Sequence, residues 1–255
     1  MPATWSEIPG PAGPLALHSA STSPAPLRPG VVVLCHGFPS GLASADHAGD
    51  GIASLADRLA AESGRRTMTA CFRGVGASAG DFSLQGWMDD LRAIVDHGAG
   101  IADGGGVWLV GFGAGGALAL CAASDDGRVH GVACLGAPAS FTSWSRHATE
   151  VIDNARHAGI IRTDGFPPDV RAWSAAFAAL HPEAAAAQIP PRALLVVHGS
   201  DDDEVPVSEA RALVEAAGDG AELRVVLGAG NRLLADPRAV ALLAGWLERQ
   251  PSGRA

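Results

Sequence analysis

Short apolar runs alternate with amphipathic stretches along most of the chain. Val31–Cys35 reads VVVLC, a continuous run rich in β-branched residues of the kind that is buried on both faces of a parallel sheet. Residues 1–30 carry Gly and Pro at short intervals, which predicts short edge strands and turns. Further apolar runs predict strands at residues 66–72, 107–112, 129–135, 193–198 and 222–227.

Between these runs, apolar residues recur with the period of a helix. In residues 86–97, for example, Trp87, Leu91 and Ile94 share one side. The same pattern predicts helices at residues 51–62, 114–123, 208–217 and 237–249. Strands that alternate with helices predict an α/β protein with a mostly parallel, doubly wound sheet. No repeat and no long linker is present, so we expect one domain over residues 1–255.

One stretch, between residues 135 and 193, breaks this alternation. It predicts two helices, the second over residues 169–180 with Val170, Trp173 and Phe177 on one face. An insert of this size at the carboxyl edge of a sheet is usually a lid over a pocket, and we place it at about residues 141–190. The alternative is extra packing against the sheet. The insert contains four aromatic residues that would either line a cavity or hold the lid down, namely Trp144, Phe166, Trp173 and Phe177.

Composition and charge narrow the function classes. The chain is 47% hydrophobic and 18% charged, as in globular proteins, and its net charge of −9 argues against nucleic-acid and membrane partners. Residues 1–20 show no signal-peptide pattern, and the longest apolar run, residues 107–123, holds four glycines, which favours a buried strand–turn–helix over a membrane span. The four cysteines have no CxxC spacing and predict core residues of a reduced, cytoplasmic protein without zinc.

Four local motifs follow the predicted strands in a fixed order. They are His36-Gly37-Phe38, Phe72-Arg73-Gly74-Val75-Gly76-Ala77-Ser78, Gly111-Phe112-Gly113-Ala114-Gly115 and the turn HGSDDDEVP of residues 198–206. In this order and spacing they resemble the oxyanion loop, the R-G-x-G-x-S loop, the nucleophile elbow and the acid-bearing turn of the α/β-hydrolase superfamily, serine hydrolases and esterases among them. The resemblance spans nearly the whole chain and implies the α/β-hydrolase fold without a cofactor or a metal.

The chain departs from that family at two triad positions. The elbow G-x-S-x-G has Gly113 where the nucleophilic serine belongs, and the stretch Gly228–Asn231 has Asn231 where the resemblance places the histidine base. Asp202 matches the acid. A carboxamide can hydrogen-bond an aspartate, but it cannot accept a proton near neutral pH. Gly113 would also relieve the strained backbone of an elbow at no steric cost.

The resemblance implies that an oxyanion hole survives these departures. By family analogy its donors are the backbone N–H groups of Phe38 and Ala114, in a region that includes His36 and Gly37. Loss of a triad nucleophile or base costs about 10⁶ in kcat, whereas the oxyanion hole and binding still supply about 10³–10⁴ over water. We therefore expect a protein that binds a small acyl or carboxylate ligand, or a protein partner, without serine-hydrolase activity.

Several alternatives remain open at this point. The chain could be an enzyme with non-hydrolytic chemistry driven by the oxyanion hole, or a serine hydrolase whose serine and histidine were replaced artificially. Ser40, Ser200 or Cys35 could stand in for the nucleophile. Gly111, Gly113 and Gly116 also fit the dinucleotide fingerprint G-x-G-x-x-G, although no acidic residue follows in residues 132–138. The acidic run of residues 201–204 could attract a cation, but such turns are usually solvated. We also expect His147, His157 and His181 to be surface residues.

Overall fold

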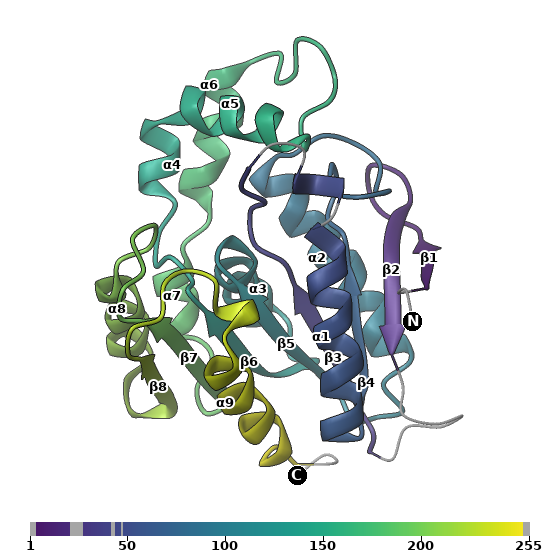
Figure 1. Cartoon of the computed structure of the whole chain (residues 1–255), viewed down its shortest axis with the longest axis vertical. Helices are drawn as coiled ribbons and strands as arrows, with labels where there is room; N and C mark the ends of the chain where they lie inside the picture. Colours follow the sequence, from purple (N-terminus) through teal and green to yellow (C-terminus); the bar gives the residue numbers. More distant parts are fainter. Residues whose placement is uncertain (1–3, 21–27, 42–43, 47, 252–255) are drawn as a thin grey trace.

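The computed structural model describes residues 4–20, 28–41, 44–46 and 48–251. They form an eight-stranded sheet in the order β1-β2-β4-β3-β5-β6-β7-β8, with helices on both faces (Figure 1). β2 pairs antiparallel with β1 and β4, and all neighbours from β4 to β8 are parallel. The strands are β1 (Trp5–Ile8), β2 (Leu15–Ala20), β3 (Val31–Cys35), β4 (Arg66–Ala70), β5 (Val107–Phe112), β6 (Val129–Leu135), β7 (Ala193–Gly199) and β8 (Ala221–Val226).

Long helices connect most of the parallel strands. They are α1 (Ala48–Ser63), α2 (Leu84–Gly100), α3 (Ala114–Asp125) and α8 (Val207–Ala217), and a further helix, α9 (Pro237–Glu248), follows β8. Short 3₁₀ turns lie at Ser44–Asp46, Gly218–Gly220 and Leu233–Ala235. The predicted doubly wound α/β sheet is confirmed, and β5 and β6 have the predicted bounds. Of the two strands in the amino-terminal segment, β1 is an edge strand as predicted, whereas β2 pairs on both sides, so the predicted edge position is wrong for it. Residues 21–27 of that segment lie outside the described residues.

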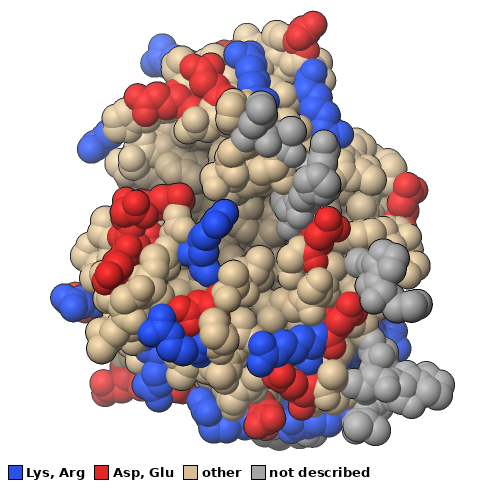
Figure 2. All heavy atoms as spheres, viewed as in Figure 1, with Lys and Arg blue, Asp and Glu red and all other residues tan. Residues whose placement is uncertain are grey.

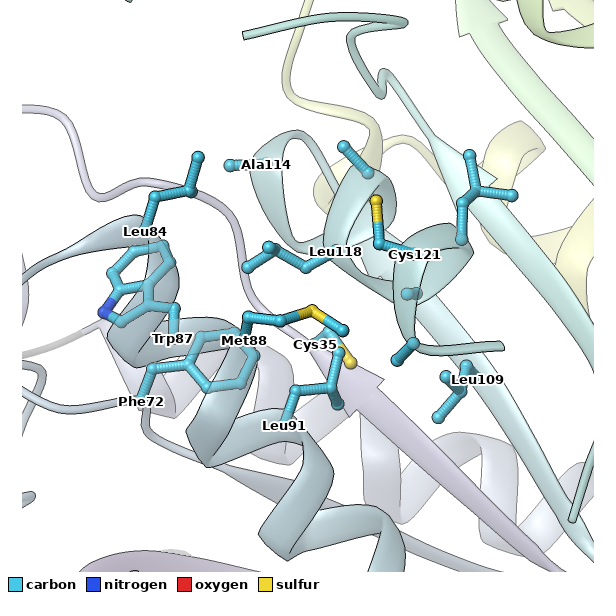
Figure 3. Packing of buried hydrophobic residues seen from close by; sticks show 14 of the residues in the cluster. Cys35, Phe72, Leu84, Trp87, Met88, Leu91, Leu109, Ala114, Leu118 and Cys121 are labelled. Carbon is cyan, nitrogen blue, oxygen red and sulfur yellow. The ribbon is translucent and has the colours of Figure 1, made fainter. Parts of the chain in front are cut away.

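The continuous apolar runs are explained by a core on each face of the sheet. In β3, Val31, Val33 and Cys35 join one cluster with α2 and α3, whereas Val32 and Leu34 join another with α1 and α9. Figure 3 shows the first of these layers, where Leu118 of α3 lies beside Met88 of α2. Because successive strand residues point to opposite faces, a strand covered on both sides must be apolar throughout.

Two predictions from composition can be compared with this packing. All four cysteines are buried free thiols, and burial raises the pKa of the Cys35 thiol to about 12, as suits inert core residues. In the described part of the chain, no helix is long and apolar enough to cross a membrane. The apolar run of residues 107–123 forms β5 and most of α3, the predicted strand–turn–helix.

Most of residues 141–190 form a helical layer over the carboxyl ends of the parallel strands, whereas the last helix of this segment, α7 (Pro182–Ala186), packs against α3 and α8 (Figure 1). The segment contains more helices than the two expected: α4 (Thr142–Arg146), α5 (Ala148–Ala158), α6 (Val170–Ala175), the 3₁₀ turn η2 (Ala176–Ala179) and α7. Trp173 and Phe177 are buried as predicted, but the prediction for Val170 is wrong, since it is 42% exposed. α6 passes into a 3₁₀ turn at residue 176, so the helical period on which the prediction relied does not persist.

Arg162 fastens this layer to the loop that follows β4. Its guanidinium donates hydrogen bonds to the carbonyl oxygens of Gly74 (2.5 Å) and Gly76 (2.9 Å). The Asp81 carboxylate accepts from the backbone N–H groups of Arg162 (2.6 Å) and Thr163 (3.1 Å). A lid function for residues 141–190 stays a prediction.

Candidate functional site

Loops at the carboxyl ends of β3, β5, β6, β7 and β8 surround a cavity of about 750 Å³. Figure 2 shows this face hollowed below the helical layer of residues 141–190. Six of the seven residues singled out in the sequence line the cavity: Gly37, Phe38, Gly113, Ala114, Asp202 and Asn231. Ligands of open α/β sheets bind at this edge, so the topology alone brings these distant segments together.

Gly113 occupies a sharp turn between β5 and α3. Its φ of 52° and ψ of −125° lie in a region that L-residues with a side chain adopt only under strain. Its N–H donates to the Leu135 carbonyl at 2.9 Å, which ties the turn to β6. A Cβ at this position would meet only the Gly37 Cα, at 3.9 Å. The cavity therefore has room for a side chain at residue 113, and the backbone already has the conformation of a strand-to-helix elbow.

The other glycines of this segment allow backbone segments to approach closely. A Cβ at Gly115 would overlap the His36 carbonyl oxygen and lie 2.7 Å from that of Cys35. A Cβ at Gly111 would overlap the backbone of Gly115 and Gly116. β5 also lies between β3 and β6, in the middle of the sheet. Close packing thus accounts for the spacing that resembles a dinucleotide fingerprint.

Replacing Gly115 by alanine is expected to lower the free energy of unfolding by about 1–3 kcal/mol, since the new methyl group would be forced against the loop after β3. Gly100 provides the control, because a Cβ there meets nothing within 4 Å at the end of α2. Gly100→Ala should leave stability unchanged or raise it by up to about 1 kcal/mol. Urea denaturation of both variants measures the difference, and equal stabilities would contradict the proposed close approach.

Phe38 and Ala114 both line the cavity. Within the described residues, neither backbone amide donates a hydrogen bond to another protein group. Ala114 is the first residue of α3, where the aligned peptide dipoles favour negative charge. The Phe38 ring packs edge-on against Trp144 with centroids 5.2 Å apart. Two free main-chain donors beside an aromatic wall are suited to an oxygen that carries negative charge.

His36 is the one singled-out residue that does not line the cavity. Its ring is 4% exposed and stacks on Phe72 and Trp87. Nδ1 lies 2.8 Å from the Gly37 carbonyl oxygen, and Nε2 accepts from the Phe72 N–H at 3.0 Å. Burial lowers the pKa of the ring to about 4, although the bond to Gly37 opposes this shift. His36 therefore positions the loop as a neutral side chain and makes no contact with the cavity.

Asp202 follows β7, and its side chain is only 1% exposed. Oδ1 accepts the backbone N–H groups of Glu204 (3.0 Å) and Val205 (2.8 Å), whereas Oδ2 is buried without a hydrogen-bond partner. The Nε2 of His198 lies 3.5 Å from Oδ2, but it also lies 2.7 Å from the Val205 carbonyl oxygen. A carbonyl oxygen can only accept, so the proton on Nε2 goes to Val205.

Asn231 lies in the loop after β8 and is half-buried on the cavity wall. The hydrogen bond that a carboxamide could make to Asp202 does not occur in the described structure, because Oδ1 of Asp202 accepts from two backbone donors and Oδ2 has no partner. The structure therefore places residues 113, 202 and 231 on one cavity without a hydrogen bond between Asn231 and Asp202.

Charged residues at the cavity are mostly acidic. Glu204 and Glu209 line it together with Asp202, and Glu209 accepts the Ala139 N–H at 2.8 Å. Arg232 is the exposed basic residue of the lining and forms no ion pair within the described chain. Asp201, Asp203 and Glu204 are exposed, and among the described residues no group of His, Cys, Asp or Glu side chains is arranged to hold a metal ion. His147, His157 and His181 are exposed, as expected.

The candidate substitute nucleophiles occupy different surroundings. Cys35 is buried, and Ser200 donates to Asp201 while it accepts the Gly228 N–H, so both lie off the cavity lining. Ser40 does line the cavity. Of the four aromatic residues considered for the lid, Trp144 lines the cavity, whereas Trp173 and Phe177 are buried in the packing below the layer.

Sequence analysis missed the ion pair that holds the loop after β4. The fully buried Asp90 of α2 accepts three hydrogen bonds from Arg73: from the backbone N–H at 2.8 Å, Nε at 3.0 Å and Nη2 at 2.7 Å. Asp90 lies three residues after Trp87 and four before Ile94, on the face predicted to point inward. Because a buried carboxylate is usually paired with a cation, an aspartate on an inward-facing side of a helix could have predicted this ion pair.

Comparison with known proteins identifies the family and the fold of this chain. The profile of a family described as the Alpha/beta hydrolase family matches residues 32–242. Among solved structures, XC6422 from Xanthomonas campestris, an a/b serine hydrolase without lid, is 21% identical (97% of this chain, 93% of that one, TM-score 0.63). The alpha/beta hydrolase GrgF from Penicillium sp. sh18 is 16% identical (98% of both chains, TM-score 0.71). The Pyrococcus furiosus esterase Pf2001 is 16% identical (97% and 92%, TM-score 0.70). A comparison with curated proteins finds no match.

Proposed function

This chain belongs to the alpha/beta hydrolase family, and we propose that it binds a small acyl or carboxylate ligand in place of hydrolysing one. In this proposal Gly113, Asp202 and Asn231 occupy the nucleophile, acid and base positions of a triad that has kept only its acid. Phe38 and Ala114 supply the main-chain donors for the ligand oxygen. His36 and Gly37 shape the loop that carries Phe38.

The observation that carries the proposal is the pair of free amides beside a residue with no side chain. Within the described residues, the amides of Phe38 and Ala114 have no protein acceptor, and both residues line the cavity together with Gly113 and Asp202. An acyl or carboxylate oxygen satisfies such donors, because charge-assisted hydrogen bonds to an oxyanion are about twice as strong as neutral ones. The Arg232 guanidinium on the cavity wall adds a second attraction for an anionic group.

The same geometry argues against hydrolysis. Attack on a bound carbonyl needs a nucleophile at residue 113 and a base within hydrogen-bond reach of it, and glycine and asparagine provide neither. Loss of a triad nucleophile or base lowers the kcat of a serine hydrolase by about 10⁶, so we expect turnover of a bound ester to be too slow to detect. Ligand polarisation without turnover follows from this arrangement.

We expect no labelling by a fluorophosphonate probe and no hydrolysis of p-nitrophenyl esters above the buffer rate. We also expect a thermal shift with short- or medium-chain carboxylic acids, since a ligand at 100 times its Kd adds about 2.7 kcal/mol to the free energy of unfolding. Intact-mass measurement after probe treatment and melting curves over an acid series test both points.

Two results would contradict the proposal. Stoichiometric labelling of any serine, Ser40 above all, would mean that a substitute nucleophile operates. Absence of a thermal shift with every acyl and carboxylate compound would favour a protein partner as the ligand of this cavity.

A further inference from the structure

The Oδ2 atom of Asp202 is an acceptor without a donor. The side chain is 99% buried, and Oδ1 is held by the Glu204 and Val205 amides, so the carboxylate is fixed in one orientation. Oδ2 is the oxygen left over, on a residue that lines the cavity. Burial of a carboxylate oxygen without a hydrogen bond is unfavourable, so a donor from outside the chain, whether a ligand or a water molecule, would stabilise this atom.

No neighbouring element of the described structure supplies that donor. On β7, His198 gives its Nε2 proton to the Val205 carbonyl oxygen. After β6, Gly136 has no side chain, and a Cβ there would lie 3.6 Å from Oδ2 and 3.7 Å from a Leu233 methyl group. After β8, the Asn231 carboxamide makes no hydrogen bond to Asp202, and after β5, Gly113 has no side chain. Gly136 and Leu233 therefore lie beside Oδ2 without a side-chain donor.

The charge of the cavity wall matches a donor that is also a cation. Three carboxylates line the cavity, those of Asp202, Glu204 and Glu209, against the single guanidinium of Arg232. An anionic ligand without a positive group would meet this excess of negative charge, whereas a ligand with a protonated nitrogen would be complementary to it. In the same cavity, the free amides of Phe38 and Ala114 provide hydrogen-bond donors for a negatively charged oxygen.

The cavity is large enough for a ligand that spans both polarities. Its volume is about 750 Å³, and a neighbouring hollow of about 320 Å³ shares Phe38, Trp144 and Glu204 with it. Pockets of 300–1,000 Å³ hold small organic ligands.

We infer that Asp202 and the space beside Gly113 form a subsite for a protonated nitrogen that bears an N–H, such as an imidazolium or a primary ammonium group. The ligand donates that N–H to Oδ2 while its carbonyl or carboxylate oxygen accepts from the Phe38 and Ala114 amides. This inference rests on the proposed function for the second contact, and it narrows the ligand class from acyl compounds in general to acyl or carboxylate compounds with a basic nitrogen.

Two probes of similar shape test the subsite. Imidazole-4-acetate and phenylacetate share a carboxylate on a one-carbon arm, and only the first carries N–H groups. Calorimetric titration of the full chain should give a Kd at least about tenfold lower for imidazole-4-acetate, because a hydrogen bond to a charged group contributes that much. Imidazole alone should bind more weakly, at the same subsite.

Matched variants separate the subsite from general electrostatics. Asp202→Asn keeps the Oδ1 acceptor for the two backbone amides and replaces Oδ2 by a donor, so the preference for imidazole-4-acetate should disappear. Glu204→Gln removes one carboxylate from the same cavity wall, with an exposed side chain, and should keep most of the preference. If Asp202→Asn does not fold, Asn231→His tests the same point, since the new ring would occupy the subsite and block imidazole.

The outcomes distinguish the inference from the proposed function. If phenylacetate binds and imidazole-4-acetate binds no better, the subsite is wrong, a water molecule suffices for Oδ2, and carboxylate binding stands. An equal loss of preference in Asp202→Asn and Glu204→Gln would also overturn the subsite. If imidazole binds in an Asp202-dependent way while neither carboxylate adds affinity, the subsite stands and the carboxylate proposal falls. Absence of binding by all three probes would overturn both.

Discussion

The double substitution Gly113→Ser with Asn231→His is expected to give this protein a measurable esterase activity. The turn at residue 113 already has the conformation of an elbow, and a side chain added there would meet only the Gly37 Cα, at 3.9 Å. A histidine at position 231 would lie on the same cavity wall as Asp202, whose Oδ2 has no protein donor. The oxyanion donors are backbone groups, so neither substitution removes them.

The gain should be strongly non-additive. Gly113→Ser alone has no base, and Asn231→His alone has no nucleophile, so each single variant should remain near the buffer rate. General base catalysis contributes about 10²–10⁴, which is the expected ratio of kcat/KM between the double variant and Gly113→Ser on a small activated ester. Gly113→Ser should also lower the free energy of unfolding by about 1–3 kcal/mol, because a side chain at this φ and ψ is strained.

Kinetics and thermal melting of the wild type, both single variants and the double variant test this expectation. Appearance of fluorophosphonate labelling at residue 113 in the double variant would be an independent sign of an activated serine. A folded double variant without activity would mean that residues 113, 202 and 231 do not form a triad geometry, and the triad assignment would be wrong.

Replacement of Asp90 by alanine is expected to be among the most destabilising single changes in the chain. Its carboxylate is fully buried and holds Arg73 through the backbone N–H, Nε and Nη2. Removal leaves the guanidinium, itself 14% exposed, without its partner in an apolar environment. Breaking a buried pair in this way costs about 3–5 kcal/mol, which for a domain of this size corresponds to a fall in Tm on the order of 10 °C.

Asp96 gives a matched control on the same helix. Asp96 accepts from Arg128 at 2.6 Å, as short a contact as that of Asp90, but the Asp96 side chain is 65% exposed and the Arg128 side chain 50%. Asp96→Ala should cost no more than about 1 kcal/mol, because exposed ion pairs contribute little. Urea denaturation of both variants gives the comparison, and similar losses of stability would show that burial does not govern the Asp90 pair.

The predictability of the fold from sequence follows from the burial of the sheet. β5 and β6 are covered on both faces, so their apolar runs begin and end with the strands, and the predicted bounds are those observed. The layer of residues 141–190 was less predictable. α4 and α7 are five residues long, too short to show a helical period, and α6 ends at residue 175, where a 3₁₀ turn interrupts the helix predicted over residues 169–180.

The sequence predicted which loops meet at the candidate site, but it did not predict most of the polar contacts within it. The order of the motifs brought six of the seven residues to one cavity. The polar contacts depended on atoms that no motif specifies. His36 turned inward because both its ring nitrogens find backbone partners, and Asp202 kept an unpaired oxygen because Asn231 does not reach it with a hydrogen bond. Arg162 and Asp90 act on the loop after β4 from distant segments, which spacing does not reveal.

The two halves of the cavity differ in what mutation can do to them. The amides of Phe38 and Ala114 belong to the main chain, so every residue type except proline would preserve the N–H itself. The acceptor opposite them is a single side-chain oxygen of Asp202, and one amino-acid substitution removes it. Most substitutions would therefore preserve the anion-binding half, whereas a single substitution can abolish the cation-binding half. Among close relatives of this chain, we expect ligand preference to diverge through position 202 well before the capacity to hold an oxygen at the elbow is lost.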